Sequence, residues 1–260
     1  MICRIGLLAG LVLGCASVAA AETKNIDRTL PLSAMGTVAL DAHNGRIDIR
    51  TWDRPEVEVH ARIDWPGLSS SSYRFRDTTV NVEGSADRVT IKWISPDQYG
   101  WSLWSLFDGG WIGPDVHYTV TAPKNARLEI HNHNASTDIR DVNAAVHLAT
   151  HNGMVRVTNL GGPLDLRMHN GWARVDFASF TTDSRIVTHN GVIEVALPAA
   201  TAFDFDSRGH HVRVDSDFQP ATHASYYDRY RGGNVGGTVN GGGPDLRFVS
   251  HNGSIRIRKK

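Results

Sequence analysis

Hydrophobic and polar residues alternate along most of this chain, and the alternation is organised around a repeated His-Asn-Gly triplet. Side chains of a β-strand point to opposite faces with a period of two. The pattern therefore predicts strands that bury one face, with the histidine pointing outward. The apolar positions after the triplet are Ile47 and Ile49, Val155 and Val157, Ala173 and Val175, Ile193 and Val195, and Ile255 and Ile257; those before it are Val38 and Leu40, Val146 and Leu148, Leu164 and Leu166, and Leu246 and Phe248.

The triplet recurs at nearly constant intervals, which is typical of a stacked β architecture. Complete copies begin at His43, His151, His169, His189 and His251, and a degenerate copy begins at His133. Asn and Gly tolerate the positive φ that a sharp corner demands. Each triplet is therefore predicted to be a structural corner, and the regular ones are His151, Asn152 and Gly153; His169, Asn170 and Gly171; and His189, Asn190 and Gly191.

Two all-β architectures fit this pattern. In a single-domain parallel β-solenoid, each coil of 18 to 20 residues stacks on the next about 4.8 Å away. In an antiparallel hairpin meander, each Asn-Gly closes a two-residue hairpin. The near-constant period favours the solenoid, whose thin core leaves no room for an interior pocket.

The remaining segments carry a less regular pattern. Strands are expected at 56–63, 78–83, 88–94 and 116–122, the regular coils run from 128 to 214, and a degenerate corner at 207–211 lies about one period after His189. The pattern is lost before the last coil. We expect one domain over 22–260 with insertions at about 93–113 and 217–243.

Composition excludes several classes of function. The chain has 27 Lys and Arg and 27 Asp and Glu, so it has no overall basic field to attract nucleic acid. It contains no nucleophile elbow, zinc-protease motif, phosphate loop or dinucleotide fingerprint. We therefore expect no catalytic residues and no cofactor. Beyond the first two dozen residues, no apolar stretch is long enough to span a membrane.

The N-terminus predicts export. Arg4 precedes an apolar run over 5–13, and Ala19-Ala20-Ala21 fits a signal-peptide cleavage site, so 1–21 is interpreted as a signal peptide. The alternative is a lipoprotein anchored through Cys15. Both readings place the protein outside the cytoplasm, in the periplasm or secreted. Both cysteines of the chain lie in this segment, so the folded domain is expected to contain no disulfide.

Three segments and the repeat together resemble a known family. They are 45–49, 52–59 and 118–123, followed by the recurring Asn-Gly-x-Ile/Val-x-Val/Ile. These residues resemble the bacterial putative adhesin family of unknown function, also called toastrack domains, over nearly the whole mature chain. The resemblance implies an extracytoplasmic β-solenoid, often in envelope or membrane-linked signalling settings, and implies no shared catalytic residues.

Histidine before each Asn-Gly is one departure from the family pattern. Stacked coils would place His133, His151, His169 and His189 in an outward row with a spacing of about 4.8 Å. Such a row could pack ring on ring, or neighbouring pairs could share a metal. A straight row does not converge as a structural metal site requires, so packing is favoured. Like imidazoles should also resist charging together, and we expect acid to weaken the stack.

A second departure is an aromatic insertion. It holds Trp93, Tyr99, Trp101, Trp104 and Trp111, and Tyr226 and Tyr227 form a comparable group near the other end. These residues could fold down as caps over exposed strand edges. They could instead contact a sugar, a partner protein or a membrane interface.

A charged column at Asp138, Arg156, Arg174, Glu194 and Arg213 is interpreted as a surface ladder of weak ion pairs. The sequence as a whole favours a non-enzymatic exported protein that presents its surface for adhesion or scaffolding to an envelope polysaccharide or protein. The first alternative is an accessory or sensory module of envelope signalling that binds a membrane protein. The second is a polysaccharide-cleaving β-helix enzyme.

Overall fold

The computed structural model describes residues 22–65, 77–95, 114–219, 221–223 and 235–260, and these form an open, mostly parallel β-sheet. The predicted all-β class is confirmed for this part of the chain. None of these residues belongs to a helix long and apolar enough to cross a membrane. The strands are β1 (Glu22–Pro31), β2 (Thr37–Trp52), β3 (Glu56–Trp65), β4 (Thr79–Gly84), β5 (Arg88–Ile94), β6 (Asp115–Pro123), β7 (Arg127–Arg140), β8 (Val146–Leu160), β9 (Leu164–Phe177), β10 (Ser184–Leu197), β11 (Phe203–Ser216), β12 (Ala221–His223), β13 (Val235–Val239) and β14 (Asp245–Lys259).

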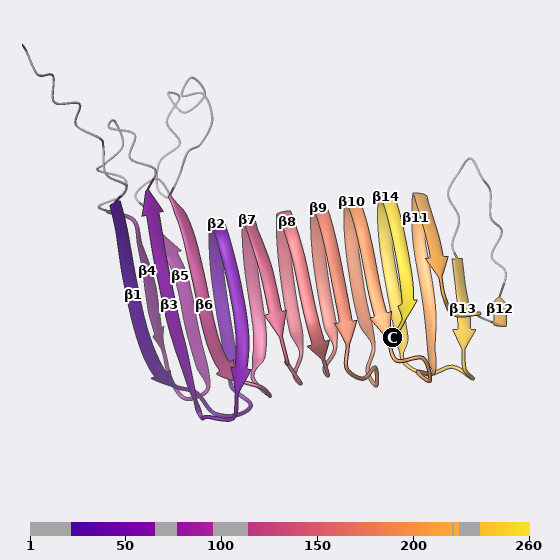
Figure 1. Cartoon of the computed structure of the whole chain (residues 1–260), viewed down its shortest axis with the longest axis horizontal. Helices are drawn as coiled ribbons and strands as arrows, with labels where there is room; N and C mark the ends of the chain where they lie inside the picture. The colour runs from indigo at the N-terminus through magenta and orange to yellow at the C-terminus, as the bar shows by residue number, and fades with distance from the viewer. Residues whose placement is uncertain (1–21, 66–76, 96–113, 220, 224–234) are drawn as a thin grey trace, which may run out of the picture.

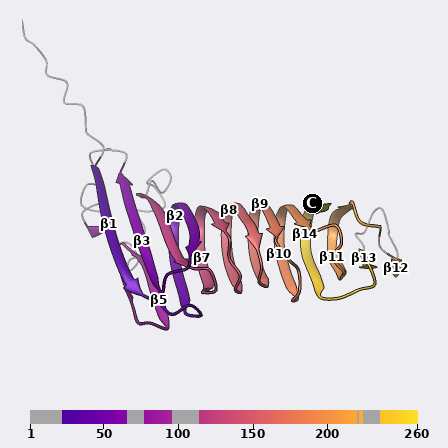
Figure 2. The ribbon, with the colours of Figure 1, turned by 60° about the horizontal axis from the view of Figure 1, so that its bottom comes forward.

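The strands stand side by side along the long axis of an elongated molecule, from β1 at one end to β12 at the other (Figures 1 and 2). Their order is β1-β3-β6-β2-β7-β8-β9-β10-β14-β11-β13-β12, and the β4-β5 hairpin pairs with β2 beside this path. β3 to β6 correspond to the four irregular strands that the sequence predicts.

The repeat strands pair in parallel and in register. Asn152 lies opposite Asn170, and Asn170 lies opposite Asn190, so successive triplets superpose. Parallel stacking of the repeats is therefore confirmed, and the antiparallel meander is wrong for them. Antiparallel pairs occur among the described strands only toward the two ends, where β1, β3, β4, β5 and β6 meet and where β11, β12 and β13 meet.

The long repeat strands are bent back on themselves (Figure 1), and apolar side chains from both sides of the triplet share one core. We call the part before the triplet the first arm and the part after it the second arm. Every apolar position that the alternation predicts to be buried is at most 2% exposed, and the side chains of both arms belong to one core cluster. The outward positions of each arm consequently line up from strand to strand as columns.

The last strand of the chain occupies an unexpected place. The sequence puts the degenerate corner at 207–211 next in line after the His189 copy, but β14 lies between β10 and β11. Because β14 carries a complete triplet, its corner matches that of β10 position by position, with Asn252 opposite Asn190. β11, whose corner is degenerate, then pairs with the far side of β14.

Glycine and asparagine play different parts at the corner. Gly153 and Gly171 have φ of 143° and 137°. A Cβ on Gly171 would lie 2.0 Å from the carbonyl oxygen of Gly153, so the close approach of neighbouring strands also requires glycine there. The asparagines of the triplets are not among the described residues with positive φ. The expectation that they supply this backbone freedom is therefore wrong.

Candidate functional site

Six imidazole rings form a continuous stack along the corner, which we call the histidine column. The ring centroids of neighbouring members are 4.7 to 5.2 Å apart and their planes differ by at most 6°. The row predicted from His133 to His189 is confirmed, and it is longer than predicted by one ring at each end. The members, in spatial order, are His43, His133, His151, His169, His189 and His251.

Both ends of the column are covered by a further ring. At one end the half-buried Trp93 of β5 stacks on His43, with centroids 5.0 Å apart and an interplanar angle of 12°. At the other end His210 of β11 meets His251 edge-on at 5.2 Å. Trp93 therefore belongs to the histidine column as an end group.

The asparagines beside the column form a second ladder, which we call the asparagine ladder. Each side-chain Nδ2 donates to the Oδ1 of the preceding neighbour, over distances of 2.8 to 3.1 Å. An interior member such as Asn170 therefore makes two amide hydrogen bonds, whereas an end member makes one. The ladder runs through Asn44, Asn134, Asn152, Asn170, Asn190 and Asn252.

The environment of the column disfavours the charged imidazole at two described positions. The pKa of His43 is lowered by partial burial and by repulsion from His133, although Asp41 acts in the opposite direction. The pKa of His169 is lowered by loss of hydration and then by repulsion from its two neighbours in the stack. A proton on His43 or His169 is therefore disfavoured in part by repulsion from the neighbouring imidazoles.

The arrangement does not suit a metal ion. Among the described residues, no group of three or more His, Cys, Asp or Glu side chains is placed to hold one. The rings of His151 and His169 are stacked with parallel planes, whereas tetrahedral sites need ligands that converge on one point. The alternative of a metal on His133, His151, His169 and His189 gains no support from this geometry.

An open groove of about 720 Å³ runs beside the histidine column on the first-arm side, from β7 to β11. Histidine and arginine side chains border it, and Ala149, Val187 and Val249 contribute apolar surface between them. No Asp or Glu is among its lining residues. Its basic and titratable members are His131, His151, His169, His189, His210, His251, Arg167 and Arg208.

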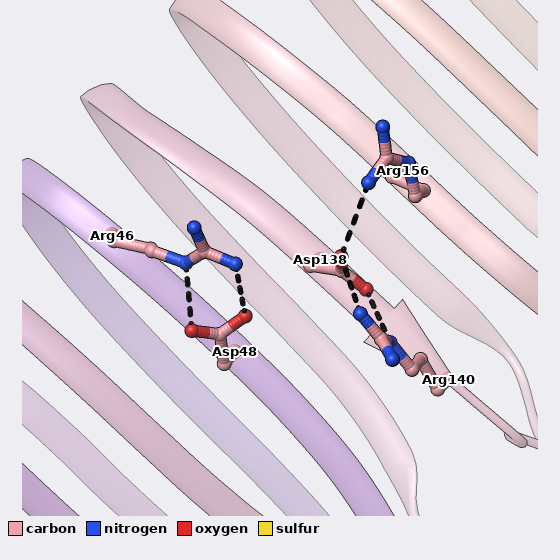
Figure 3. A network of polar contacts seen from close by, with 5 residues as sticks. All are labelled: Arg46, Asp48, Asp138, Arg140 and Arg156. Carbon is pink, nitrogen blue, oxygen red and sulfur yellow. Dashed lines mark hydrogen bonds and ion pairs between the residues drawn. The ribbon is translucent and has the colours of Figure 1, made fainter.

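The second arms carry ion pairs of a different character. Asp138 is only 8% exposed and accepts two hydrogen bonds from Arg140, at 2.9 and 3.0 Å (Figure 3). One of its carboxylate oxygens also lies 3.7 Å from a guanidinium nitrogen of Arg156. Arg46 and Asp48 form a separate pair. The hydrogen bonds from Arg140 are the largest cause that lowers the pKa of Asp138. This carboxylate is consequently held in its ionised form.

The predicted charged column needs one correction. Arg174 and Glu194 approach within 3.4 Å as expected, but the next charged neighbour of Glu194 is Arg256 of β14, at 3.9 Å. Arg213 lies opposite Ser254, one strand farther along. Asp215 is the residue of β11 that lies opposite Arg256, so Arg213 is two residues out of register with the charged column.

The other aromatic residues singled out by the sequence, Tyr99, Trp101, Trp104, Trp111, Tyr226 and Tyr227, lie outside the described residues. The sequence analysis missed a different apolar stripe. Met154, Trp172 and Val192 occupy the position just after each triplet and lie opposite one another on β8, β9 and β10. Met154 is 49% exposed. Apolar residues at a position that alternation assigns to the outer face are the signal that could have identified the stripe.

Comparisons with known proteins find one solved structure with a similar fold and others that are more distant. No family model matches the chain, and no curated protein matches it. A putative cell adhesion protein from Clostridium sporogenes is similar in structure, with a TM-score of 0.50 and 8% sequence identity over 91% of this chain and 100% of that one.

Two further solved structures are more distant. A putative adhesin from Bacteroides fragilis has a TM-score of 0.29 and 10% identity, over 91% of this chain and 97% of that one. A putative lipid binding protein from Parabacteroides distasonis has a TM-score of 0.27 and 11% identity, over 90% of this chain and 97% of that one. At these identities the likeness concerns the fold alone, and the fold of this chain is similar to that of the C. sporogenes cell adhesion protein.

Proposed function

We propose that this chain is an exported, non-enzymatic β-solenoid protein of the bacterial envelope, and that its stacked surface serves adhesion or scaffolding toward an envelope polysaccharide or protein. The observation that carries the proposal is the register of the repeats. Because each triplet lies directly beside the next, outward side chains form long columns with one chemical group per strand. A surface of that kind suits an extended or repetitive partner.

Two carboxylates of β7, one on each arm, do not have the property of a general acid. A glycoside hydrolase needs one carboxyl group with a raised pKa to act as the general acid. The pKa values of Asp138 and Glu129 are lowered instead, mainly by hydrogen bonds from Arg140 and Arg88. These arginine-bound carboxylates suit a surface that holds its shape better than one that transfers protons.

Export and envelope location rest on the sequence of the first 21 residues, with the signal peptide or the alternative lipid anchor at Cys15. The fold similarity to the C. sporogenes protein, which is described as a putative cell adhesion protein, is in keeping with a surface role. The alternative role, an accessory module of envelope signalling, differs in its partner, which would be a membrane protein.

A titration of the purified protein against envelope fractions tests the proposal. The fractions are envelope polysaccharide, peptidoglycan and solubilised membrane protein, and the readout is intrinsic tryptophan fluorescence. Saturable binding to polysaccharide or peptidoglycan without release of new reducing ends supports an adhesive role. Binding confined to the membrane protein fraction favours the signalling alternative, and cleavage of a polysaccharide contradicts the non-enzymatic assignment.

A further inference from the structure

We propose that the groove beside the histidine column binds an extended acidic polysaccharide, and that it binds this ligand more tightly at mildly acidic pH than at neutral pH. The inference names a ligand class for the proposed adhesive surface and therefore rests on the proposed function. It is carried by the shape of the groove, the chemistry of its lining and the spacing of its imidazoles.

The shape of the groove selects a linear ligand. It crosses the strands from β7 to β11 along the stacking axis and is open to solvent. A ligand lying in it would meet one imidazole per strand, at intervals of 4.7 Å from His151 to His251. A pyranose ring in an extended chain spans a similar length, so successive sugars can meet equivalent groups.

The lining selects an anion that also has apolar faces. Arg167 and Arg208 supply guanidinium groups whose side chains are 64% and 62% exposed. Each also pairs with an aspartate two residues before it, which holds its position and leaves other N–H donors for a ligand. Val187 and Val249 lie on the two strands between those of Arg167 and Arg208, and their side chains suit the apolar face of a sugar ring. A polymer of uronic acids combines both features, with one carboxylate per ring.

The stacked imidazoles make binding depend on pH. No Asp or Glu is among the lining residues of the groove, so a bound polyanion would bring negative charge next to the imidazoles. The carboxylates nearby are Asp41, which lies opposite His131, and Asp165 and Asp206, which pair with Arg167 and Arg208. Protonated rings that repel one another in the free protein would be stabilised by a carboxylate on each sugar. By linkage, acid strengthens binding and binding raises the histidine pKa values.

Other charged groups face the column from the strands around it, and they do not reverse the expected increase of affinity in acid. Asp41 on β2 acts on His43, and it lies opposite Lys92 of β5 and opposite the groove residue His131 of β7. In the groove, β8, β10 and β14 contribute uncharged side chains at the equivalent outward position. The charged or titratable groups of the groove beside the column are His131 on β7, Arg167 on β9, and Arg208 and His210 on β11.

Fluorescence anisotropy with labelled alginate oligomers tests the proposal directly. The full-length mature protein is titrated at constant ionic strength at about pH 7.5 and about pH 5.5, which bracket the ordinary histidine pKa. We expect affinity to rise by about tenfold or more at the lower pH. Cello-oligosaccharides of equal length serve as the neutral probe, and inorganic polyphosphate serves as the phosphate-based polyanion.

Two groups of variants separate the contributions. Arg167→Gln with Arg208→Gln should weaken alginate binding at both pH values. The triple variant His151→Asn, His169→Asn and His189→Asn should remove most of the gain at low pH. Arg213→Gln, which removes one exposed positive charge from the second arm of β11, is the matched control and should leave binding unchanged. Far-UV circular dichroism checks that each variant is folded.

Several outcomes would overturn the inference. These are equal affinity at the two pH values, equal binding of the neutral glycan, tighter binding of polyphosphate than of alginate, or an equal loss in the Arg213→Gln control. Should the triple histidine variant fail to fold, the arginine pair and the pH dependence of the unmodified protein still decide the question. Binding of envelope polysaccharide that no groove variant affects would refute this inference alone, whereas cleavage of alginate would refute the proposed function.

Discussion

Replacing one interior member of the asparagine ladder should cost about twice as much stability as replacing an end member. Asn170→Ala removes two hydrogen bonds, the one it donates to Asn152 at 2.9 Å and the one it accepts from Asn190 at 3.0 Å. Asn252→Ala removes only the bond donated to Asn190, at 2.9 Å. Both residues follow a histidine of the column and precede a glycine, so the comparison holds the local sequence nearly constant.

The magnitude follows from the number of bonds. A neutral hydrogen bond contributes about 0.5 to 1.5 kcal/mol net. Asn170→Ala is therefore expected to lower the free energy of unfolding by about 2 kcal/mol and Asn252→Ala by about 1 kcal/mol. Neither asparagine has a positive φ, so alanine introduces no backbone strain that would blur the comparison.

Urea unfolding provides the assay. The free energy of unfolding is obtained from the midpoint and slope of the transition, monitored by far-UV circular dichroism and by tryptophan fluorescence. Coincident transitions from the two probes are required, because arrays of repeats can lose cooperativity. Equal losses in the two variants, or no loss in Asn170→Ala, would refute the idea that the amides form a cooperative ladder.

Four further predictions concern the corner and the charged groups. Gly171→Ala should destabilise the folded protein by about 3 kcal/mol or more, because the new Cβ would lie 2.0 Å from a backbone oxygen. Gly241→Ala should cost about 1 kcal/mol, because Gly241 also has a positive φ but has open space around it. Thermal unfolding of the two variants checks the difference. The pKa of His169 is lowered in the folded protein, so the neutral ring contributes fully to stability above the unfolded pKa of 6.5, and this contribution is lost as the pH falls below that value. On acidification, the His169→Asn variant should therefore lose less stability than the unmodified protein. His60 has a raised pKa, mainly from its hydrogen-bonded aspartate, so its contribution is present below 6.5 and lost as the pH rises through the folded value; His60→Gln should therefore destabilise at about pH 5.5 and have little effect at about pH 7.5. Asp138→Asn should cost about 1 to 2 kcal/mol at neutral pH, and in urea titrations the difference should vanish as the pH falls through the lowered pKa of this carboxyl.

Local patterning was enough to predict the core and the corner stack. The period-two alternation identified side chains such as Val155 and Leu166 as buried, because the inner face of a strand excludes polar groups. The constant spacing of the triplets implied parallel pairing, and the stacking of His151 on His169 follows from that register. These features depend on neighbouring repeats alone, so sequence periodicity contains them.

Sequence periodicity does not predict the features that depend on how distant segments pair. The edge of β10 that does not pair with β9 could pair with either β11 or β14. The structure pairs it with β14, and the spacing of triplets along the chain does not predict this. The pairing of Glu194 with Arg256 follows from that choice, whereas Arg213 leaves the charged column because the register of β11 places Asp215 opposite Arg256. The asparagine ladder was missed for another reason, since turn propensity offered a sufficient explanation for Asn-Gly and concealed the role of the amide.

The repeats align six imidazoles in one histidine column, and the pKa values of His43 and His169 are lowered there, while His151, His169, His189 and His251 border the groove. An NMR pH titration of the imidazole resonances, with and without alginate oligomers, tests both the lowered pKa values and the proposed binding in the groove. We predict that His43 and His169 titrate below the ordinary value of 6.5 in the free protein, and that alginate raises the apparent pKa of His169. Apparent pKa values above 6.5 in the free protein would contradict the stacked column, and a pKa of His169 that alginate leaves unchanged would contradict its place in a binding groove.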